Sequence, residues 1–129
     1  MPELIDTPLR IPVPGGKLID EYVGRARTGQ PQVSVARMQA PPGWSEPAQT
    51  PEFDEITMVL AGQLVVDHGG GVTEVGPGQA VVTRAGERVR YAVGAEGAEY
   101  VAICLPAFSP ELAHREEQPE PDGQAGTRR

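Results

Sequence analysis

Apolar and polar residues alternate in short runs along most of this chain, and glycine or proline residues separate the runs. Residues 33–38 alternate in this way. A second run, 53–66, is dense in strand-forming residues and is interrupted only at Ala61-Gly62. A period of two is typical of β-strands, whose successive side chains point to opposite faces. Apolar residues on both faces of the 53–66 run indicate a strand that is covered on both sides.

The same pattern predicts further short strands downstream, at 73–75, 80–83, 89–93 and 100–105. A loop is expected at 94–97, because glycines bound it. Upstream, residues 17–27 fit a short helix or a strand equally well. Beyond residue 105 the pattern stops, apart from a brief helical turn expected within 110–117, with Ser109 as its cap and Pro110 at its first position.

The regular spacing of strands and turns predicts an all-β fold, an antiparallel sandwich or barrel. A chain of 129 residues suffices for one domain, which we expect to span residues 17–117. An extended N-terminal arm, residues 1–16, is expected before it, since prolines recur there. Residues 118–129 have no apolar anchor and are expected to form a disordered tail.

Composition and charge narrow the classes of function. The chain has 11 basic and 18 acidic residues, a formal net charge of −7, so its mean field repels a polyanion and nucleic-acid binding is not expected. No apolar run approaches the roughly 20 residues of a membrane span, and the N-terminus lacks the apolar core of a signal peptide. Cys104 is the only cysteine, which fits a reducing compartment. We therefore expect a cytoplasmic protein.

The segment around Glu55 resembles the first sequence signature of the cupin family, G-x5-H-x-H-x3or4-E-x6-G. Gly43 begins the matching segment, Glu55 fills the glutamate position, and Gly62 falls where the last glycine is required. Residues 84–86 resemble the turn of the second cupin signature. The resemblance extends over about 33–105 and implies a cupin-type jelly-roll barrel with a site in its interior.

The histidines that bind metal in cupins are missing from this chain. Other residues fill their positions: Gln49 and Pro51, or Ala48 and Thr50 with the longer spacer, and Val89. Imidazole is the preferred neutral ligand for iron, nickel or zinc, so the resemblance implies an interior without cofactor or metal. The alternative is a divalent ion held weakly by Glu55, Gln49 and Glu46. The chain is also similar to the cupin domain of ethanolamine-utilisation proteins, which lacks the same histidines.

Glu55 is the strongest candidate for chemistry. In the cupin register it points into the barrel on the same face as Thr57, where desolvation raises the pKa of a carboxyl toward neutrality. Tyr91 is expected to face the interior as a second catalytic residue, able to donate to a substrate oxygen, with core packing as the alternative. The residues expected to bind substrate are Gln49, Glu46, Thr57, Tyr100 and Trp44. A solvated loop is the alternative for Glu46, and packing is the alternative for Trp44.

These features favour a small-molecule enzyme, an isomerase, cyclase or lyase that uses acid–base chemistry on a carbonyl-bearing substrate. Glu55 would transfer the proton, while Tyr91 and Gln49 orient the substrate oxygen. Two alternatives stay open: a non-catalytic cupin that binds a small ligand or supports a partner enzyme, and a metal-dependent cupin. Open strand edges and the N-terminal arm predict a homodimer.

Overall fold

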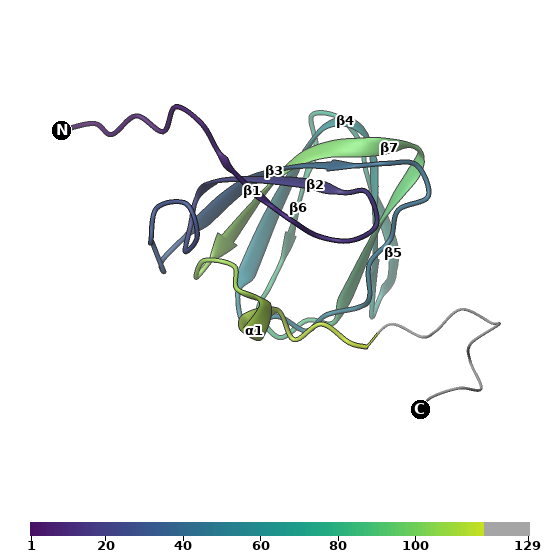
Figure 1. Ribbon diagram of the computed structural model, residues 1–129. Coiled ribbons are helices and arrows are strands. Elements are labelled where there is room, and N and C mark those ends of the chain that lie inside the picture. Colours follow the sequence, from purple (N-terminus) through teal and green to yellow (C-terminus); the bar gives the residue numbers. More distant parts are fainter. Residues whose placement is uncertain (118–129) are drawn as a thin grey trace, which may run out of the picture.

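The computed structural model of the protein describes residues 1–117; the predicted tail, 118–129, lies outside the described residues. Within 1–117 the elements are β1 (Leu9–Ile11), β2 (Leu18–Val23), β3 (Ser34–Ala40), β4 (Asp54–His68), β5 (Gly71–Val75), β6 (Ala80–Thr83), β7 (Val89–Leu105) and the one-turn helix α1 (Pro110–Ala113). All strand pairings are antiparallel. The expected all-β sandwich or barrel is confirmed (Figure 1).

Two long, bent strands connect the layers of the barrel. The strand order is β1-β2-β3-β7-β4-β5, with β6 beside the first part of β4. Residues 54–62 of β4 pair with 98–105 of β7, and residues 64–68 pair with 89–93. Each long strand therefore contributes one half to each layer, and in Figure 1 β7 crosses the top of the barrel and turns down at the right.

Glycines allow this bend. Gly62 has a φ of +75°, and a Cβ there would lie 2.1 Å from the carbonyl oxygen of Gly97. The register also shifts on both sides of Gly62. The loop predicted at 94–97 is wrong: these residues continue β7, because β4 bends beside them and pairs with β7 before and after the bend.

The two chain ends add to the barrel. Residues 17–27, ambiguous from periodicity, supply β2 rather than a helix, because β1 and β3 pair with it on either side. Part of the predicted arm, Leu9–Ile11, forms β1, while the residues before it extend away from the barrel (Figure 1). The helical turn is confirmed: the Ser109 Oγ accepts a hydrogen bond of 3.2 Å from the Leu112 amide.

The core lies between the layers. Its buried residues are Ala40, Trp44, Val59, Leu64, Val66, Val75, Val89, Tyr91, Ala98 and Tyr100. A smaller cluster, Phe53, Cys104 and Ala113, packs beneath α1. In this core the aromatic rings of Trp44, Tyr91 and Tyr100 pack with the buried residues of β4. In residues 1–117 no helix has the length and apolar character that a membrane crossing requires.

Candidate functional site

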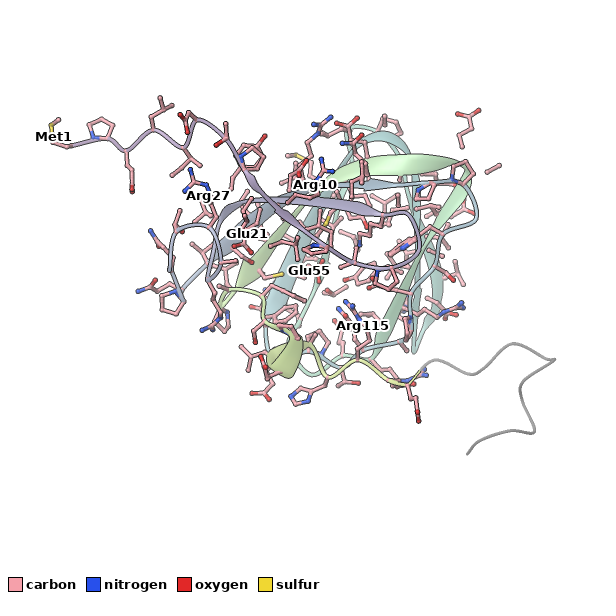
Figure 2. The ribbon with its side chains drawn as sticks, viewed as in Figure 1. Met1, Arg10, Glu21, Arg27, Glu55 and Arg115 are labelled. Atoms are coloured by element: carbon pink, nitrogen blue, oxygen red, sulfur yellow. The ribbon has the colours of Figure 1, made fainter. Side chains whose placement is uncertain are left out.

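Two carboxylates and two cations meet in the interior of the barrel. Glu55 comes from β4, and Lys17 comes from the residue before β2. Glu46 comes from the segment between β3 and β4, and Arg115 comes from the segment after α1. The charges of Glu46, Lys17 and Arg115 all act on Glu55. Figure 2 shows Glu55 in the middle of the barrel, with Arg115 toward the end where the C-terminal segment passes.

Glu55 points inward because it alternates with buried neighbours on β4. Phe53 and Thr57, two residues to either side, are each 1% exposed, and Glu55 pairs across the ladder with Cys104 and Thr83. Glu55 itself is half-buried. Burial, followed by the negative charge of Glu46, raises its pKa to about 7, while Lys17 and Arg115 act in the opposite direction. Near neutral pH both the acid and the carboxylate are therefore populated.

Lys17 places an ammonium group in this interior. Its side chain is 8% exposed, and its Nζ lies 3.7 Å from Glu46 Oε1. The ammonium also lies 4.2 Å from the centre of the Trp44 ring and 5.4 Å from that of Tyr100, at distances where an aromatic face attracts a cation. Burial lowers the pKa of Lys17, and the charges of Glu46 and Glu55 oppose that change. Trp44 and Tyr100, predicted to bind substrate, are thus placed to hold Lys17.

Glu46 is part of the site. Its side chain is only 12% exposed, and its Oε1 lies 3.7 Å from both Lys17 Nζ and Arg115 Nη2. The alternative that Glu46 lies in a solvated loop is therefore wrong. The reason is the ladder that residues 45–49 form with β7, where Glu46 N donates to the Tyr91 carbonyl and Gln49 N to the Val89 carbonyl. These bonds fold the proline-rich segment against the barrel.

Arg115 reaches the site from the C-terminal segment. Its Nη2 donates a 3.1 Å hydrogen bond to Gln49 Oε1. The segment is held by backbone bonds, since Glu116 N donates to the Ala48 carbonyl at 2.8 Å. An ion pair between Arg88 and Glu116 fastens it from outside, with contacts of 2.6 and 2.9 Å. Gln49, which is 2% exposed, therefore orients Arg115.

The hydroxyl groups in the wall differ in their partners. The Tyr91 OH lies 3.0 Å from Thr83 Oγ1, and the ring is 4% exposed. Burial, then the charge of Glu55, raises the pKa of Tyr91, so the phenol stays protonated. Thr57 Oγ1, on the same inward face of β4 as Glu55, makes no hydrogen bond of ordinary geometry within residues 1–117, although it interacts with the Glu55 carboxyl and lowers its pKa. A buried hydroxyl without such a hydrogen bond is unusual.

Lys17, Arg115 and Thr83 are not among the residues that the sequence predicted. One signal was present: Lys17 is the only lysine of the chain. Its entry into the barrel depends on the pairing of β2 with β3, which alternation did not decide. Arg115 lies beyond the last predicted strand. Two hollows of about 360 and 490 Å³ open elsewhere, one near Gly62 and one near His68, and neither includes Glu55.

The fold and its interior define a class of protein: a small antiparallel barrel with polar groups gathered between its layers. Residues 36–106 match the model of the family described as Cupin domain. This match covers more than half of the chain, and the chain belongs to the cupin family.

One known protein is also similar to this chain in sequence. The chain is 50% identical over 107 residues to the protein named Endoribonuclease YbeY of Myxococcus xanthus. That match covers 82% of this chain and 36% of the relative, so the chain spans about a third of the relative's length. The likeness therefore concerns one part of a longer protein.

Solved cupin structures are similar in fold. A variant of Streptomyces PAC13 with uridine has a TM-score of 0.69 at 17% identity, covering 88% of each chain; Pac13 is described as a nucleoside dehydratase. A putative ethanolamine utilization protein Q from Salmonella typhimurium has a TM-score of 0.57 at 22% identity, covering 71% of each. At these identities the likeness shows the fold, which is consistent with small-molecule binding or catalysis.

The interior does not fit the metal ion that many cupins hold. No group of three or more His, Cys, Asp or Glu side chains in residues 1–117 is placed to hold one. Lys17 and Arg115 face the two carboxylates and would repel a divalent cation. Gln49 Oε1 already accepts a hydrogen bond from Arg115. The alternative of a metal held by Glu55, Gln49 and Glu46 therefore gains no support.

Proposed function

We propose that the barrel interior is an active site in which Glu55 exchanges protons with a carbonyl-bearing small molecule. One observation carries this proposal: Glu55 is half-buried on the inward face of β4, and its pKa is raised to about 7. A carboxyl group with a pKa near the ambient pH serves as base in one step and as acid in the next. An ordinary surface glutamate stays ionised at neutral pH.

The neighbouring groups suit an enolate-forming reaction. Removing a proton next to a carbonyl places negative charge on the carbonyl oxygen, and the Lys17 ammonium stabilises such charge in a water-poor interior. Thr57 Oγ1, which makes no hydrogen bond of ordinary geometry within residues 1–117, is available to a substrate oxygen. Return of the proton to another carbon gives an isomerase, and loss of a leaving group gives a lyase.

One solved neighbour performs chemistry of this class. Pac13 is described as a nucleoside dehydratase, and elimination of water requires a proton to leave one atom and another to join the departing oxygen. The present chain is similar to Pac13 in fold, with a TM-score of 0.67. We therefore place it among metal-independent acid–base enzymes, with isomerase, cyclase and lyase as the candidate classes.

Proton exchange with solvent tests the proposal without a known product. The protein is incubated in D₂O with a panel of ketones, aldehydes, 2-oxo acids and nucleosides, and loss of each C–H signal is followed by proton NMR. At least one compound should exchange, and Glu55→Gln should slow that exchange by about 10²–10⁴-fold. Full exchange with Glu55→Gln, or exchange of no compound, would count against Glu55 as the proton carrier.

An accessory role is the second candidate. It is favoured by the match to one part of a longer protein named an endoribonuclease. In this case the barrel is a small-ligand module that works beside such an enzyme, and its net charge of −7 argues against direct contact with RNA. Binding of the barrel to an endoribonuclease of that family from the same organism, measured by calorimetry, together with no proton exchange, would favour this role.

A further inference from the structure

We propose that this interior binds the carboxylate group of a small organic acid between Lys17 and Arg115. The inference names the substrate class of the site described above. Its catalytic meaning rests on the proposed function, but the binding itself does not. Three independent features of the described residues support it.

The first feature is the distance between the cations and their carboxylate. Lys17 Nζ and Arg115 Nη2 each lie 3.7 Å from the same oxygen, Glu46 Oε1. A charge-assisted hydrogen bond between such groups is typically about 2.8 Å. Glu46 thus neutralises both cations at long range and leaves room for donor contacts to another acceptor. A ligand carboxylate has the charge and the two oxygens that this pair requires.

The second feature is the charge of the interior. With Glu55 protonated, the two cations face one carboxylate, and the site holds one excess positive charge. The other titratable groups around Glu55, namely Tyr91, Tyr100 and Cys104, have pKa values raised by burial and stay neutral. An unbalanced charge is unfavourable where it is partly shielded from water, as it is at Lys17. A bound anion removes the imbalance, so binding favours protonated Glu55 and takes up a proton.

The third feature is the Thr57 hydroxyl. Thr57 is 1% exposed and lies on the inward face of β4, two residues from Glu55. Apart from an interaction with the Glu55 carboxyl, whose pKa it lowers, its Oγ1 makes no hydrogen bond of ordinary geometry among the residues that the structure describes, although buried polar groups are normally hydrogen-bonded. A ligand oxygen in this interior would satisfy it.

Arg115 marks the entry side. Its side chain is 39% exposed, against 8% for Lys17 and 12% for Glu46. Glu55 itself is only half-buried, so solvent reaches part of this interior. Arg115 is held there by a hydrogen bond to Gln49 and by its ion pair with Glu46. In Figure 2 it lies toward the end of the barrel along which the C-terminal segment passes.

The single lysine allows a direct test. Protein labelled with ¹³C-lysine gives one Cε signal, from Lys17. It is titrated at pH 6 with pyruvate, malonate and 2-oxoglutarate, and in parallel with methyl pyruvate and dimethyl malonate as neutral counterparts. At least one acid should shift the signal saturably below about 50 mM, a weak-affinity ceiling, and the esters should not.

Variants then identify the groups. Glu46→Gln removes the internal competitor and should tighten acid binding by about fivefold or more, a gain that misfolding cannot imitate. Arg115→Gln should weaken binding about tenfold. Its matched control is Arg37→Gln, an arginine of similar exposure on β3 that is paired with Glu99, and it should leave binding within about twofold. No saturable shift with any acid, equal binding of the esters, or weaker binding by Glu46→Gln would overturn the inference.

Glu55→Gln separates the two proposals. Its neutral amide imitates protonated Glu55, so this variant should bind the acid at pH 8 as tightly as the unaltered protein does at pH 6. If it binds in this way but proton exchange does not depend on Glu55, the acid site stands and the proposed catalysis fails. If Glu55-dependent exchange is found with neutral carbonyl compounds while no acid binds, the proposed catalysis stands and the acid site fails.

Discussion

Gly62 and Gly97 meet across the bend of β4 and β7, and a Cβ on Gly62 would lie 2.1 Å from the Gly97 carbonyl oxygen. The clashing atom belongs to the backbone, so it cannot move away by a rotamer change as a side-chain atom could. Gly62→Ala should therefore lower the free energy of unfolding by about 3 kcal/mol or more, from positive-φ strain plus the clash. Urea unfolding measures this loss.

Gly43→Ala is the matched control for that prediction. Gly43 has a φ of +80° and nothing within 4 Å of an added Cβ, so only backbone strain of about 1 kcal/mol is expected. Equal losses for the two variants would mean that the close approach of the strands contributes nothing.

The pKa of Glu55 predicts how stability depends on pH. The folded-state pKa of about 7 exceeds the ordinary 4.5, so the folded protein holds this proton more tightly than the unfolded chain. Below pH 4.5 Glu55 is protonated in both the folded and the unfolded state, so its contribution to stability is fully present and does not change with pH. Between about pH 4.5 and 7 its contribution falls as pH rises, by roughly 3 kcal/mol in all.

Glu55→Gln should remove that slope. The variant should unfold at higher urea than the unaltered protein at pH 8, and the difference should shrink toward pH 5. A group that destabilises its own fold at neutral pH is typical of a functional site. Identical pH profiles for the two proteins would show that Glu55 is not shielded from water.

Cys104 should be unreactive while the protein is folded. It is 4% exposed, and burial, followed by the charge of Glu55, raises the pKa of its thiol. The thiolate is the reactive form. Ellman's reagent at pH 8 should therefore detect no thiol in the native protein and one per chain in urea. Rapid reaction under native conditions would contradict the burial of β7 beneath α1.

The predicted homodimer has a candidate surface. On the outer face, Ile56, Ile103 and Val82 lie in register across β4, β7 and β6, and Met58 beside them is 43% exposed. Contiguous exposed apolar side chains often mark protein interfaces. We expect Met58→Asp to convert a dimer to a monomer in size exclusion with light scattering.

Val72→Asp is the control for this surface. Val72 is 61% exposed but lies on β5, away from this face. Val72→Asp should leave the mass measured by light scattering the same as that of the unaltered protein. A monomer mass for the unaltered protein would contradict the dimer itself.

Alternation along the sequence was enough to predict most of the barrel, because successive residues of a β-strand lie on opposite faces and the pattern of apolar residues follows that period. It failed at 94–97, where glycines indicated a loop and the chain instead bends as a strand. That bend is possible because Gly62, more than 30 residues away, makes room for it. A contact between distant backbones leaves no local pattern.

The candidate site was predicted in part for a similar reason. Glu55 could be found because it stands at a fixed distance from glycines in one signature. Lys17 and Arg115 stand outside the matched segment, 36–106, and join Glu55 only through strand pairing and through the backbone bonds of the C-terminal segment. No spacing rule within one signature connects them.

The source of the two cations has an evolutionary consequence. Both arrive on flanking segments, whereas Glu46 and Glu55 lie within the matched segment. Replacing only the segments that carry Lys17 and Arg115 would convert a site that attracts anions into one that attracts cations, with every residue from 36 to 106 unchanged. Diversification of ligand choice in such a lineage can therefore proceed through the two segments that flank the matched one.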